Sequence, residues 1–415
     1  MANVSSSNGL EKYPKLRFPG FGEPIQAKKL SRYLIENTDR NKALKYDKSD
    51  VLSVSGEFGI VNQIAFQGRS FAGESVAEYH IVETDDIVYT KSPLKANPYG
   101  IIKVNNGNPG IVSTLYAVYH PIDVIPQYID YYFCNDLRLN KYLKPLVNIG
   151  AKHDMKVNNA AVLFGDVYFP NATEQSKIVE FLQILDYRIK KQRALVESLK
   201  KYKRGTFDAV FSQKIRLIPK PQQREWRSYK LSDFASRITR KNGVQSDIPL
   251  TISAQYGLID QRDFFSKTVA SADMSNYYLL HKGEYAYNRS TSSDYPFGSV
   301  KRLELYPMGA VSTLYLCFTV NNDIILSDLI KWYFESSKWH RTVQEICAEG
   351  ARNHGLLNVP TNGFFNTIHM LPSDPVEQMA IARYLELIQY KYDVALQELD
   401  MLMFLKNGFL QQLFI

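Results

Sequence analysis

The sequence repeats itself over nearly its whole length, and this repeat constrains the fold more than any other feature. The pentapeptide VSTLY stands at Val112–Tyr116 and again at Val311–Tyr315, 199 residues later. LSVSGEFGIVNQ (Leu52–Gln63) matches LTISAQYGLIDQ (Leu250–Gln261) at an offset of 198. A half of about 200 residues is too long for a solenoid repeat. The sequence therefore predicts two copies of one architecture, each a domain with an appendage.

Four further matches extend the repeat toward both ends of each half. They are NPYG with YPFG (Asn97–Gly100, Tyr295–Gly298), NIGAK with AEGAR (Asn148–Lys152, Ala348–Arg352), EQSKIVEFLQILDYRI with EQMAIARYLELIQYKY (Glu174–Ile189, Glu377–Tyr392), and KLRF with KIRL (Lys15–Phe18, Lys214–Leu217). The offset drifts by a few residues along the chain, as insertions in loops would cause.

The first part of each half is rich in β-forming residues between turn residues. Short runs such as YHIVETDDIVYT and YYLLHKGEYAYN are typical of strands bounded by Gly, Asn, Asp and Pro turns. We expect short helices at Gln127–Leu143 and Leu326–Cys347. Each half is then an α+β domain with an irregular sheet. Both copies of VSTLY are expected to be interior strands, repeated for structural reasons.

The second part of each half predicts a long helix. Apolar residues there alternate spacings of four and three, which indicates a coiled-coil seam of nearly four heptads. The seam residues are Ile178, Leu182, Leu185, Ile189, Val196 and Leu199, with Gln192 in register, and Ile381, Leu385, Ile388, Tyr392, Ala395, Leu399 and Leu402. Thr173 and Asp374 are the expected capping residues. A helix of 35–40 residues would span roughly 50–60 Å.

The two predicted helices carry opposite charge. Arg188–Arg204 holds eight bases and one acid, whereas Lys391–Lys406 holds two bases and three acids. These charges suit pairing between the helices, although a solvated basic face or a contact with a DNA backbone would also account for the basic run. Paired helices must run antiparallel for the chain to close. The two domains would then lie at opposite ends, related by a pseudo-twofold axis.

The resulting domain organisation has five parts. They are a flexible N-terminus at 1–14, a first domain at 15–170, a first long helix at 171–214, a second domain at 215–372 and a second long helix at 373–415.

Composition favours a soluble cytoplasmic protein. Apolar residues make up 45% of the chain and charged residues 22%, and no run reaches the roughly 18–20 apolar residues of a membrane span. The N-terminus lacks the pattern of a secretory signal. Cys134, Cys317 and Cys347 are scattered, which fits reduced thiols. The net charge of +8 weakly favours a polyanionic partner.

Motifs of catalysis are missing from the sequence. It has no phosphate loop, no GxSxG, no HExxH among its seven histidines and no CxxC, so neither a catalytic nor a metal site is expected. NPYG at Asn97–Gly100 resembles the Asn-Pro-Pro-Tyr/Phe loop of amino-methyltransferases. It lacks the second proline, and Tyr295 replaces the asparagine in the repeat, so a turn is the better interpretation. The chain is expected to bind rather than to catalyse.

Two similar domains at a fixed separation suit a ligand with two parts, and duplex DNA is the natural candidate. Two half-sites about one turn apart can be read from one face of the duplex by two such domains. The domains have diverged in sequence while keeping their frame, as reading two different half-sites would require.

Two polar loops in each half are the candidate DNA contacts, because Arg, Lys, Asn and Gln read base edges and Ser, Thr and cations bind phosphates. The first pair of loops holds Lys91, Ser92, Lys95, Asn97 and Tyr99, and Asn288, Arg289, Ser290, Thr291, Ser292 and Tyr295. The second pair holds Lys152, His153 and Lys156, and Arg352, Asn353 and His354. Ordinary solvated loops would have the same composition.

The helical segments carry a resemblance to a known family. TEQSKIVEFLQILDYRI with LKKYKRGTF, and VEQMAIARYLELIQYKY with FLKNGFLQQLF, resemble the helical regions of the specificity subunits of type I restriction–modification systems. YPKLRFPGF and the Gly-Ala-Lys and Gly-Ala-Arg loops are similar to that family too. The chain departs from it where Pro-Asn-Ala-Thr and Pro-Ser-Asp-Pro stand in place of the Pro-Pro that often precedes Glu-Gln. The resemblance covers essentially the whole chain.

The resemblance implies a division of labour. Each domain would be a target recognition domain for one half of an asymmetric double-stranded DNA site. The helices would set the spacer and bind two methyltransferase subunits, which methylate adenine with S-adenosylmethionine. Restriction-translocase subunits would add DNA cleavage that uses ATP and Mg²⁺. This chain itself would bind no cofactor.

Two other readings remain open. The chain is alternatively a non-catalytic protein–protein scaffold with two binding domains on a coiled-coil spacer. A nucleic-acid enzyme with an unfamiliar site is a third hypothesis, against which the missing motifs argue.

Overall fold

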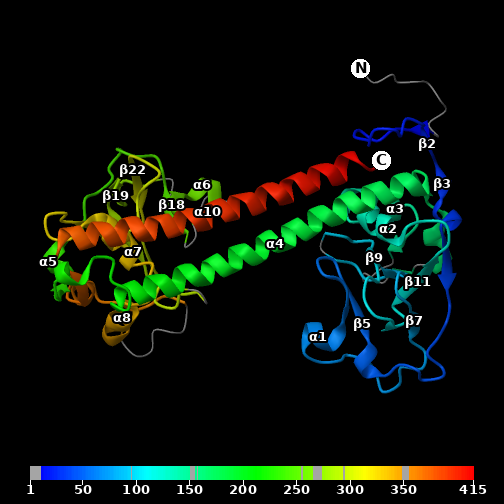
Figure 1. Cartoon of the computed structure of the whole chain (residues 1–415), viewed down its shortest axis with the longest axis horizontal. Coiled ribbons are helices and arrows are strands. Elements are labelled where there is room, and N and C mark those ends of the chain that lie inside the picture. Colours follow the sequence, from blue (N-terminus) through cyan, green and yellow to red (C-terminus); the bar gives the residue numbers. More distant parts are fainter. Residues whose placement is uncertain are drawn as a thin grey trace. The chain divides into compact units, whose positions relative to one another are not determined.

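The computed structural model describes residues 11–94, 96–149, 155–156, 158–253, 256–264, 273–292, 295–347 and 355–415. The chain divides into two compact units (Figure 1). Unit 1 comprises Met1–Gln192 and Glu398–Ile415, and unit 2 comprises Arg193–Gln397. The division falls inside two long helices, α4 (Ala172–Phe211) and α10 (Pro375–Gln412), so each unit contains one end of both.

The two units share one sheet topology, as the repeat predicts. In unit 1 a four-stranded antiparallel sheet has the order β4 (Leu34–Asn37), β11 (Tyr116–Pro121), β8 (Ile87–Thr90) and β9 (Ile101–Val104). In unit 2 the order is β16 (Ala235–Ile238), β23 (Leu316–Val320), β20 (Tyr285–Asn288) and β21 (Ser299–Arg302). Tyr119 lies opposite Ile87 in the first sheet, and its counterpart Phe318 lies opposite Tyr285 in the second.

Two-stranded antiparallel pairs flank each sheet. In unit 1 they are β5 (Leu52–Ser55) with β6 (Gly59–Asn62), β7 (His80–Val82) with β10 (Gly110–Val112), β1 (Glu11–Lys12) with β2 (Ile25–Gln26), β3 (Lys28–Lys29) with β14 (Asp166–Val167), and β12 (Asn148–Ile149) with β13 (Met155–Lys156). In unit 2 they are β17 (Leu250–Ser253) with β18 (Gly257–Asp260), β19 (Tyr278–His281) with β22 (Met308–Val311), and β15 (Trp226–Lys230) with β24 (Ile368–Pro372). Each unit is thus an α+β domain with an irregular sheet, as expected.

Short helices cover the sheets. Besides the two long helices they are α1 (Gln63–Gln67), α2 (Pro126–Phe133) and α3 (Asp136–Leu143) in unit 1, and α5 (Leu231–Phe234), α6 (Gln261–Phe264), α7 (Ser327–Tyr333), α8 (His340–Ile346) and α9 (Thr361–Phe365) in unit 2. The short helices expected at Gln127–Leu143 and Leu326–Cys347 are therefore confirmed, and each range holds two of them. In the first, the side-chain oxygen of Asn135 accepts a hydrogen bond from the Arg138 amide at 3.0 Å and starts a new helix.

The repeated VSTLY is a turn between two strands, so the expectation of an interior strand was wrong. Val112 ends β10 and Tyr116 begins β11. Between them the Ser113 carbonyl accepts from the Tyr116 amide at 3.1 Å, and the Ser113 hydroxyl accepts from the Leu115 amide at 3.4 Å. Ser312 makes the same two bonds in unit 2, at 3.1 and 3.3 Å. A serine side chain that binds nearby backbone competes with the ladder of a sheet.

The long helices have 40 and 38 residues, which corresponds to about 60 and 57 Å of helix. Asp374 caps α10 as expected, since its carboxylate accepts from the Val376 amide at 3.0 Å. The cap of α4 is Asn171 rather than Thr173, and its side chain accepts from the Glu174 amide at 2.9 Å. The helix begins at Ala172, which places Thr173 inside its first turn.

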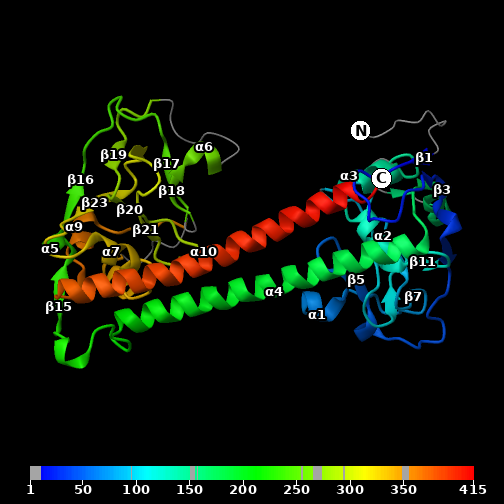
Figure 2. The ribbon, with the colours of Figure 1, turned by 45° about the horizontal axis from the view of Figure 1, so that its top comes forward.

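The helices pack antiparallel within each unit. In unit 1 the rings of Phe181 and Phe409 meet edge to face with centroids 4.9 Å apart, and Arg188 pairs with Glu398 at 3.4 Å. In unit 2 the ammonium of Lys203 lies 5.7 Å from the ring centroid of Tyr392. Figure 2 shows α4 and α10 side by side from a second direction. The pair of Arg188 with Glu398 is one of the charge pairs expected between the two helices.

None of the seam residues is exposed. Leu185, Leu199 and Tyr392 are half-buried, and the other ten apolar seam residues are buried. In unit 1 the start of α4 shares a core with Leu413 and Phe414, and in unit 2 the start of α10 shares one with Phe207 and Phe211. The C-terminal end of α10 thus completes the core of the first domain, and the C-terminal end of α4 completes the core of the second.

The end of α10 is held by an arginine of unit 1. The guanidinium of Arg138 donates to the carbonyls of Leu410 and Ile415 at 3.0 and 3.2 Å. The Leu16 amide donates to the Gln412 carbonyl at 3.0 Å. Backbone groups that the helix end leaves without helical partners are satisfied in this way.

The Glu-Gln pair that opens both helices links each domain to its helix. Arg17 forms a bidentate ion pair with Glu174, in which both N–O distances are 2.7 Å. Arg216 forms the equivalent bidentate pair with Glu377, with N–O distances of 2.5 and 2.8 Å. Both glutamates are buried, with exposed fractions of 1% and 0%. The arginines come from KLRF and KIRL, so the repeat of these motifs preserves one buried ion pair per unit.

The glutamines bind the short helices of the sheet domains. Gln175 accepts from the Ile125 amide at 3.0 Å and Gln378 from the Leu326 amide at 2.7 Å, at the starts of α2 and α7. Their amide groups donate to the carbonyls of Pro170 and Pro372. Among the described residues, no helix is long and apolar enough to span a membrane.

Candidate functional site

Three segments converge at one end of the strands of the main sheet in each unit. We call residues 91–100 and 289–298 the arm, residues 113–115 and 312–314 the turn, and residues 158–159 and 355–359 the closing segment. The arm contains the first predicted DNA-contact loop except Asn288, which directly precedes it, and the closing segment follows the second loop.

In unit 1, Lys91 at the start of the arm forms hydrogen bonds with both the turn and the closing segment. The Lys91 amide donates to the Leu115 carbonyl of the turn at 3.3 Å. Its ammonium donates to Asn159 of the closing segment at 3.2 Å, and Asn159 in turn donates to Glu36 at 2.8 Å. Burial lowers the pKa of Lys91, and nearby Arg40 lowers it further.

Unit 2 repeats this junction with an arginine. The guanidinium of Arg289 donates to the carbonyl of Leu314 in the turn at 2.9 Å and to that of Val359 in the closing segment at 3.4 Å. The Leu357 amide donates to the Arg289 carbonyl at 2.9 Å, and the Thr291 amide donates to the Gly355 carbonyl at 2.7 Å. Both units therefore use a cation at the same repeat position to tie the segments together.

The arm has the same backbone geometry in both units. Leu94 and Asn97 exchange two backbone hydrogen bonds of 3.0 and 3.1 Å, and Ser292 and Tyr295 exchange two of 3.1 Å. The arm then closes at a glycine with a positive φ, 87° at Gly100 and 78° at Gly298.

Only glycine fits where the arm rejoins the sheet. A Cβ at Gly100 would lie 2.0 Å from the carbonyl oxygen of Thr90, and one at Gly298 would lie 2.1 Å from that of Asn288. The Tyr89 hydroxyl donates to the Tyr99 carbonyl at 2.6 Å, which fixes the same end of the arm. The NPYG and YPFG motifs thus build a tight turn that requires glycine.

The predicted contact residues of unit 1 are largely engaged within the protein. The Asn97 side chain is 7% exposed and donates to Asp136 at 2.9 Å. Tyr99 is half-buried against the core, and the Ser92 amide donates to the Thr90 hydroxyl at 3.3 Å. In this conformation the Asn97 amide supports the arm rather than facing outward.

The predicted residues of unit 2 lie nearer the surface. Ser290 and Ser292 are exposed, and Asn288 accepts from the Ser290 amide at 3.0 Å. The Thr291 hydroxyl donates to the Gly355 carbonyl at 3.2 Å. The Lys301 ammonium lies 5.6 Å from the ring centroid of Tyr295. The first loop and the chain that follows the second loop therefore meet in unit 2.

Part of the predicted set lies outside the described residues. Lys95, Lys152, His153, Arg352, Asn353 and His354 belong to this part. Lys156 is the last residue of β13, where the backbone alone is described.

A hollow of about 350 Å³ opens beside the arm of unit 2. Asn288 at the end of β20, Ser290 of the arm, Leu314 of the turn and Leu356 of the closing segment line it, together with Gln261. The side-chain oxygen of Gln261 is buried, and the described residues offer it no hydrogen-bond partner. Sequence reasoning missed Gln261 and Leu314 as candidate site residues, although both lie in the repeated motifs.

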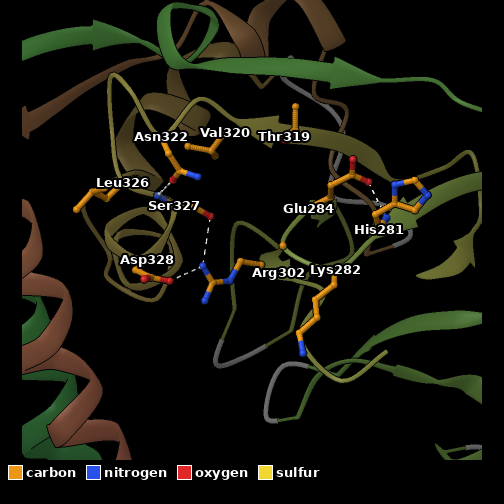
Figure 3. A pocket seen from close by; sticks show the side chains of 11 residues that line it. His281, Lys282, Glu284, Arg302, Thr319, Val320, Asn322, Leu326, Ser327 and Asp328 are labelled. Atoms are coloured by element: carbon orange, nitrogen blue, oxygen red, sulfur yellow. Dashed lines mark hydrogen bonds and ion pairs between the residues drawn. The ribbon is translucent and has the colours of Figure 1, made fainter. Parts of the chain in front are cut away.

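A second hollow of unit 2, of about 400 Å³, lies at the opposite end of strand β20 (Figure 3). Its charged groups are mixed in sign and several are paired. Arg302 donates to Asp328, with N–O 2.6 Å, and to Ser327 at 3.3 Å, and Glu284 accepts from the His281 amide at 2.7 Å. The described part of the chain holds no group of three His, Cys, Asp or Glu that could bind a metal.

The long helices also carry exposed apolar residues at matching repeat positions. Ile184 and Tyr187 of α4 are 61% and 62% exposed, and Leu387 and Tyr390 of α10 are 60% and 65% exposed. Residues three apart lie on one face of a helix. Each helix therefore presents a similar apolar surface on the side away from its seam.

Comparison with solved structures shows which fold this is. The chain matches the crystal structure of a type I restriction–modification system S subunit from M. genitalium with a TM-score of 0.56 and 13% identity, over 97% of this chain and 99% of that one. It also matches a chain from a study of complex assembly and conformational transition of the type I R-M system, with a TM-score of 0.53 and 14% identity, over 96% and 98% of the two chains.

Comparisons of sequence alone give no further match. No family model matches the chain, and no curated protein does either. The fold that the helical motifs led us to expect is nevertheless confirmed, because the structural likeness extends over essentially the whole of both chains.

Proposed function

We propose that this chain is the DNA-recognition subunit of a type I restriction–modification complex, in which each unit reads one half of a bipartite double-stranded DNA site. The observation that carries the proposal is the fold of an S subunit over 97% of the chain, built from two units of the same topology. Two units that share one topology but differ in the sequence of their arms suit two different half-sites.

The site chemistry supports DNA as the ligand. In unit 2 the exposed hydroxyls of Ser290 and Ser292 and the amide of Asn288 are groups that bind phosphates and base edges. Lys91 and Arg289 are already bonded inside their units, so their proposed role is to hold the arm in place. Binding is expected to weaken steeply with salt, because neutralised phosphates release counterions.

The long helices are proposed to hold two copies of one methyltransferase subunit. The pairs Ile184 with Tyr187 and Leu387 with Tyr390 give two similar apolar surfaces, as two copies of the same partner require. Catalysis would belong to the partners, which use S-adenosylmethionine to methylate adenine. Added restriction-translocase subunits would use ATP and Mg²⁺, and this chain would bind none of these cofactors.

The helix surfaces can be tested by copurification with the methyltransferase subunit. Tyr187→Glu and Tyr390→Glu are each expected to reduce the bound partner from two copies to one, and the double variant to abolish binding. Val244→Glu changes a residue that is 99% exposed and serves as the control. Unchanged stoichiometry in the double variant would refute this surface.

The recognition role is tested by sequencing native DNA with detection of modified bases, from the host with and without the gene. The expected result is loss of adenine methylation at one split motif, two short halves around a fixed gap. Unchanged methylation in an expressed, assembled system would leave the protein–protein scaffold as the better hypothesis.

An exchange of domains tests the assignment of one unit to one half-site. Replacing Trp226–Leu371 by the equivalent region of a relative is expected to change one half of the motif and leave the other. A change in both halves, or in neither, would refute modular recognition.

A further inference from the structure

The leucine of the repeated turn is an exposed residue with no evident role in folding. Leu115 is 64% exposed and Leu314 is 63% exposed. Folding accounts for their neighbours, because Val112 and Val311 are fully buried and the serines bind the backbone of the turn. A single exposed leucine is ordinary on a protein surface. An exposed leucine at the same repeat position in each unit is not explained in this way.

The turn has stayed identical beside an arm that has changed. Residues 113–115 and 312–314 both read Ser-Thr-Leu, whereas Lys91, Pro93 and Leu94 of the first arm correspond to Arg289, Thr291 and Ser292 of the second. The first residue of each arm donates a hydrogen bond to the turn, Lys91 from its backbone amide in unit 1 and Arg289 from its guanidinium in unit 2. Leu115 and Leu314 therefore lie within the candidate site itself.

The surroundings of Leu314 combine an apolar wall with amide groups. It lines the 350 Å³ hollow together with Asn288 and with Gln261, whose side-chain oxygen has no partner among the described residues. An amide reads adenine in the major groove, and the C5 methyl of thymine is the apolar group on the edge of the same base pair. Leu314 and the Asn288 amide thus offer an apolar group and an amide group to an A·T pair, and the Gln261 oxygen, which is buried, is not counted among them.

We propose that Leu115 and Leu314 each contact the C5 methyl of a thymine, one in each half-site. This inference rests on the proposed function, because adenine methylation in both halves requires an A·T pair in each. A residue that is identical in both units suits a base pair that both half-sites contain. The diverged arms would then read the positions that differ.

The test replaces single thymines by deoxyuridine, which removes only the C5 methyl. Competition binding would use the complex assembled with its methyltransferase subunits and duplexes that carry the split motif. One substitution in each half-site is expected to weaken wild-type binding about fourfold, the effect of one buried methyl group. Leu115→Ala should lose this sensitivity in one half-site only, and Leu314→Ala in the other only.

Two controls separate this role from general effects. Leu137→Ala and Leu305→Ala remove leucines that are 82% and 63% exposed and lie outside the arm, the turn and the closing segment. Both variants should keep the full deoxyuridine effect. Unchanged thermal unfolding of the Leu115 and Leu314 variants would show that they remain folded.

Several outcomes would overturn the inference while leaving the proposed function intact. These are a half-site without thymine, wild-type binding that ignores every deoxyuridine, or leucine variants that bind more weakly yet keep the sensitivity to the methyl group. If the wild-type complex shows no preference for the split motif at all, the proposed function fails and this inference fails with it.

Discussion

Breaking the buried ion pair between Arg216 and Glu377 by removing one partner is expected to destabilise unit 2 strongly. Glu377 is 0% exposed and accepts two hydrogen bonds from the guanidinium and one from the Trp226 indole, at 3.2 Å. Arg216→Met removes the guanidinium and leaves the carboxylate buried with the indole. Removing one partner of a buried ion pair costs about 3–5 kcal/mol.

Tryptophan fluorescence can follow unit 2 by itself. The three tryptophans of the chain, Trp226, Trp332 and Trp339, all lie in unit 2 and are buried. With a urea dependence of about 2 kcal/mol per molar, Arg216→Met should lower the midpoint of the fluorescence transition by about 1.5–2.5 M. The matching variant Arg17→Met in unit 1 should leave this transition near its wild-type midpoint and change the circular-dichroism curve instead.

The control is a surface pair at the start of the same helix. Arg224 lies 3.9 Å from Asp374 and its side chain is 74% exposed, so Arg224→Met should change stability by less than about 1 kcal/mol. The double variant Arg216→Met with Glu377→Gln should be more stable than Arg216→Met alone, because it removes the buried charge. An Arg216→Met midpoint no lower than that of Arg224→Met would refute the reasoning.

Three further predictions concern the arm, a buried histidine and the clamp on α10. Gly298→Ala should destabilise unit 2 by about 1–3 kcal/mol more than Gly243→Ala, since both glycines have positive φ but a Cβ at Gly243 meets open space; urea midpoints from fluorescence would show this. Burial lowers the pKa of His369 to about 4 from an ordinary 6.5, so its stabilising effect should be complete above pH 6.5 and lost as the pH falls through 4. The full loss is about 3 kcal/mol, and stability curves of His369→Gln should lack this pH dependence. Arg138→Ala should destabilise unit 1 and leave the tryptophan transition in place, as paired fluorescence and circular-dichroism curves would report.

The repeat and the helical pattern predicted most of the architecture. Helical periodicity depends on local spacing, so Ile178, Leu182, Ile381 and Leu385 identified the buried side of each long helix. The repeat of Glu-Gln and of the preceding arginines marked a contact that requires the chain to fold back over more than 150 residues. Its partners became clear only in the structure, because sequence distance carries no information about such a contact.

The candidate site was less predictable, because exposure depends on tertiary packing. Asn97 has the residue type of a base reader, but Asp136 holds its amide in a buried position. Lys91 is a cation in a polar loop, yet it is bonded to Asn159. Leu314 was overlooked because VSTLY alternates like a strand, and only the serine hydroxyl reveals the turn that exposes the leucine.

The clamp on the end of α10 has a consequence for the order in which the protein is made. The segment Glu398–Ile415 belongs to unit 1, yet the ribosome synthesises it after the whole of unit 2. The core around Leu413 and Phe414 must therefore wait until these residues have been synthesised, while unit 2 can close first. A premature stop codon shortly before Leu410 would accordingly damage unit 1, although most of its residues are synthesised before unit 2.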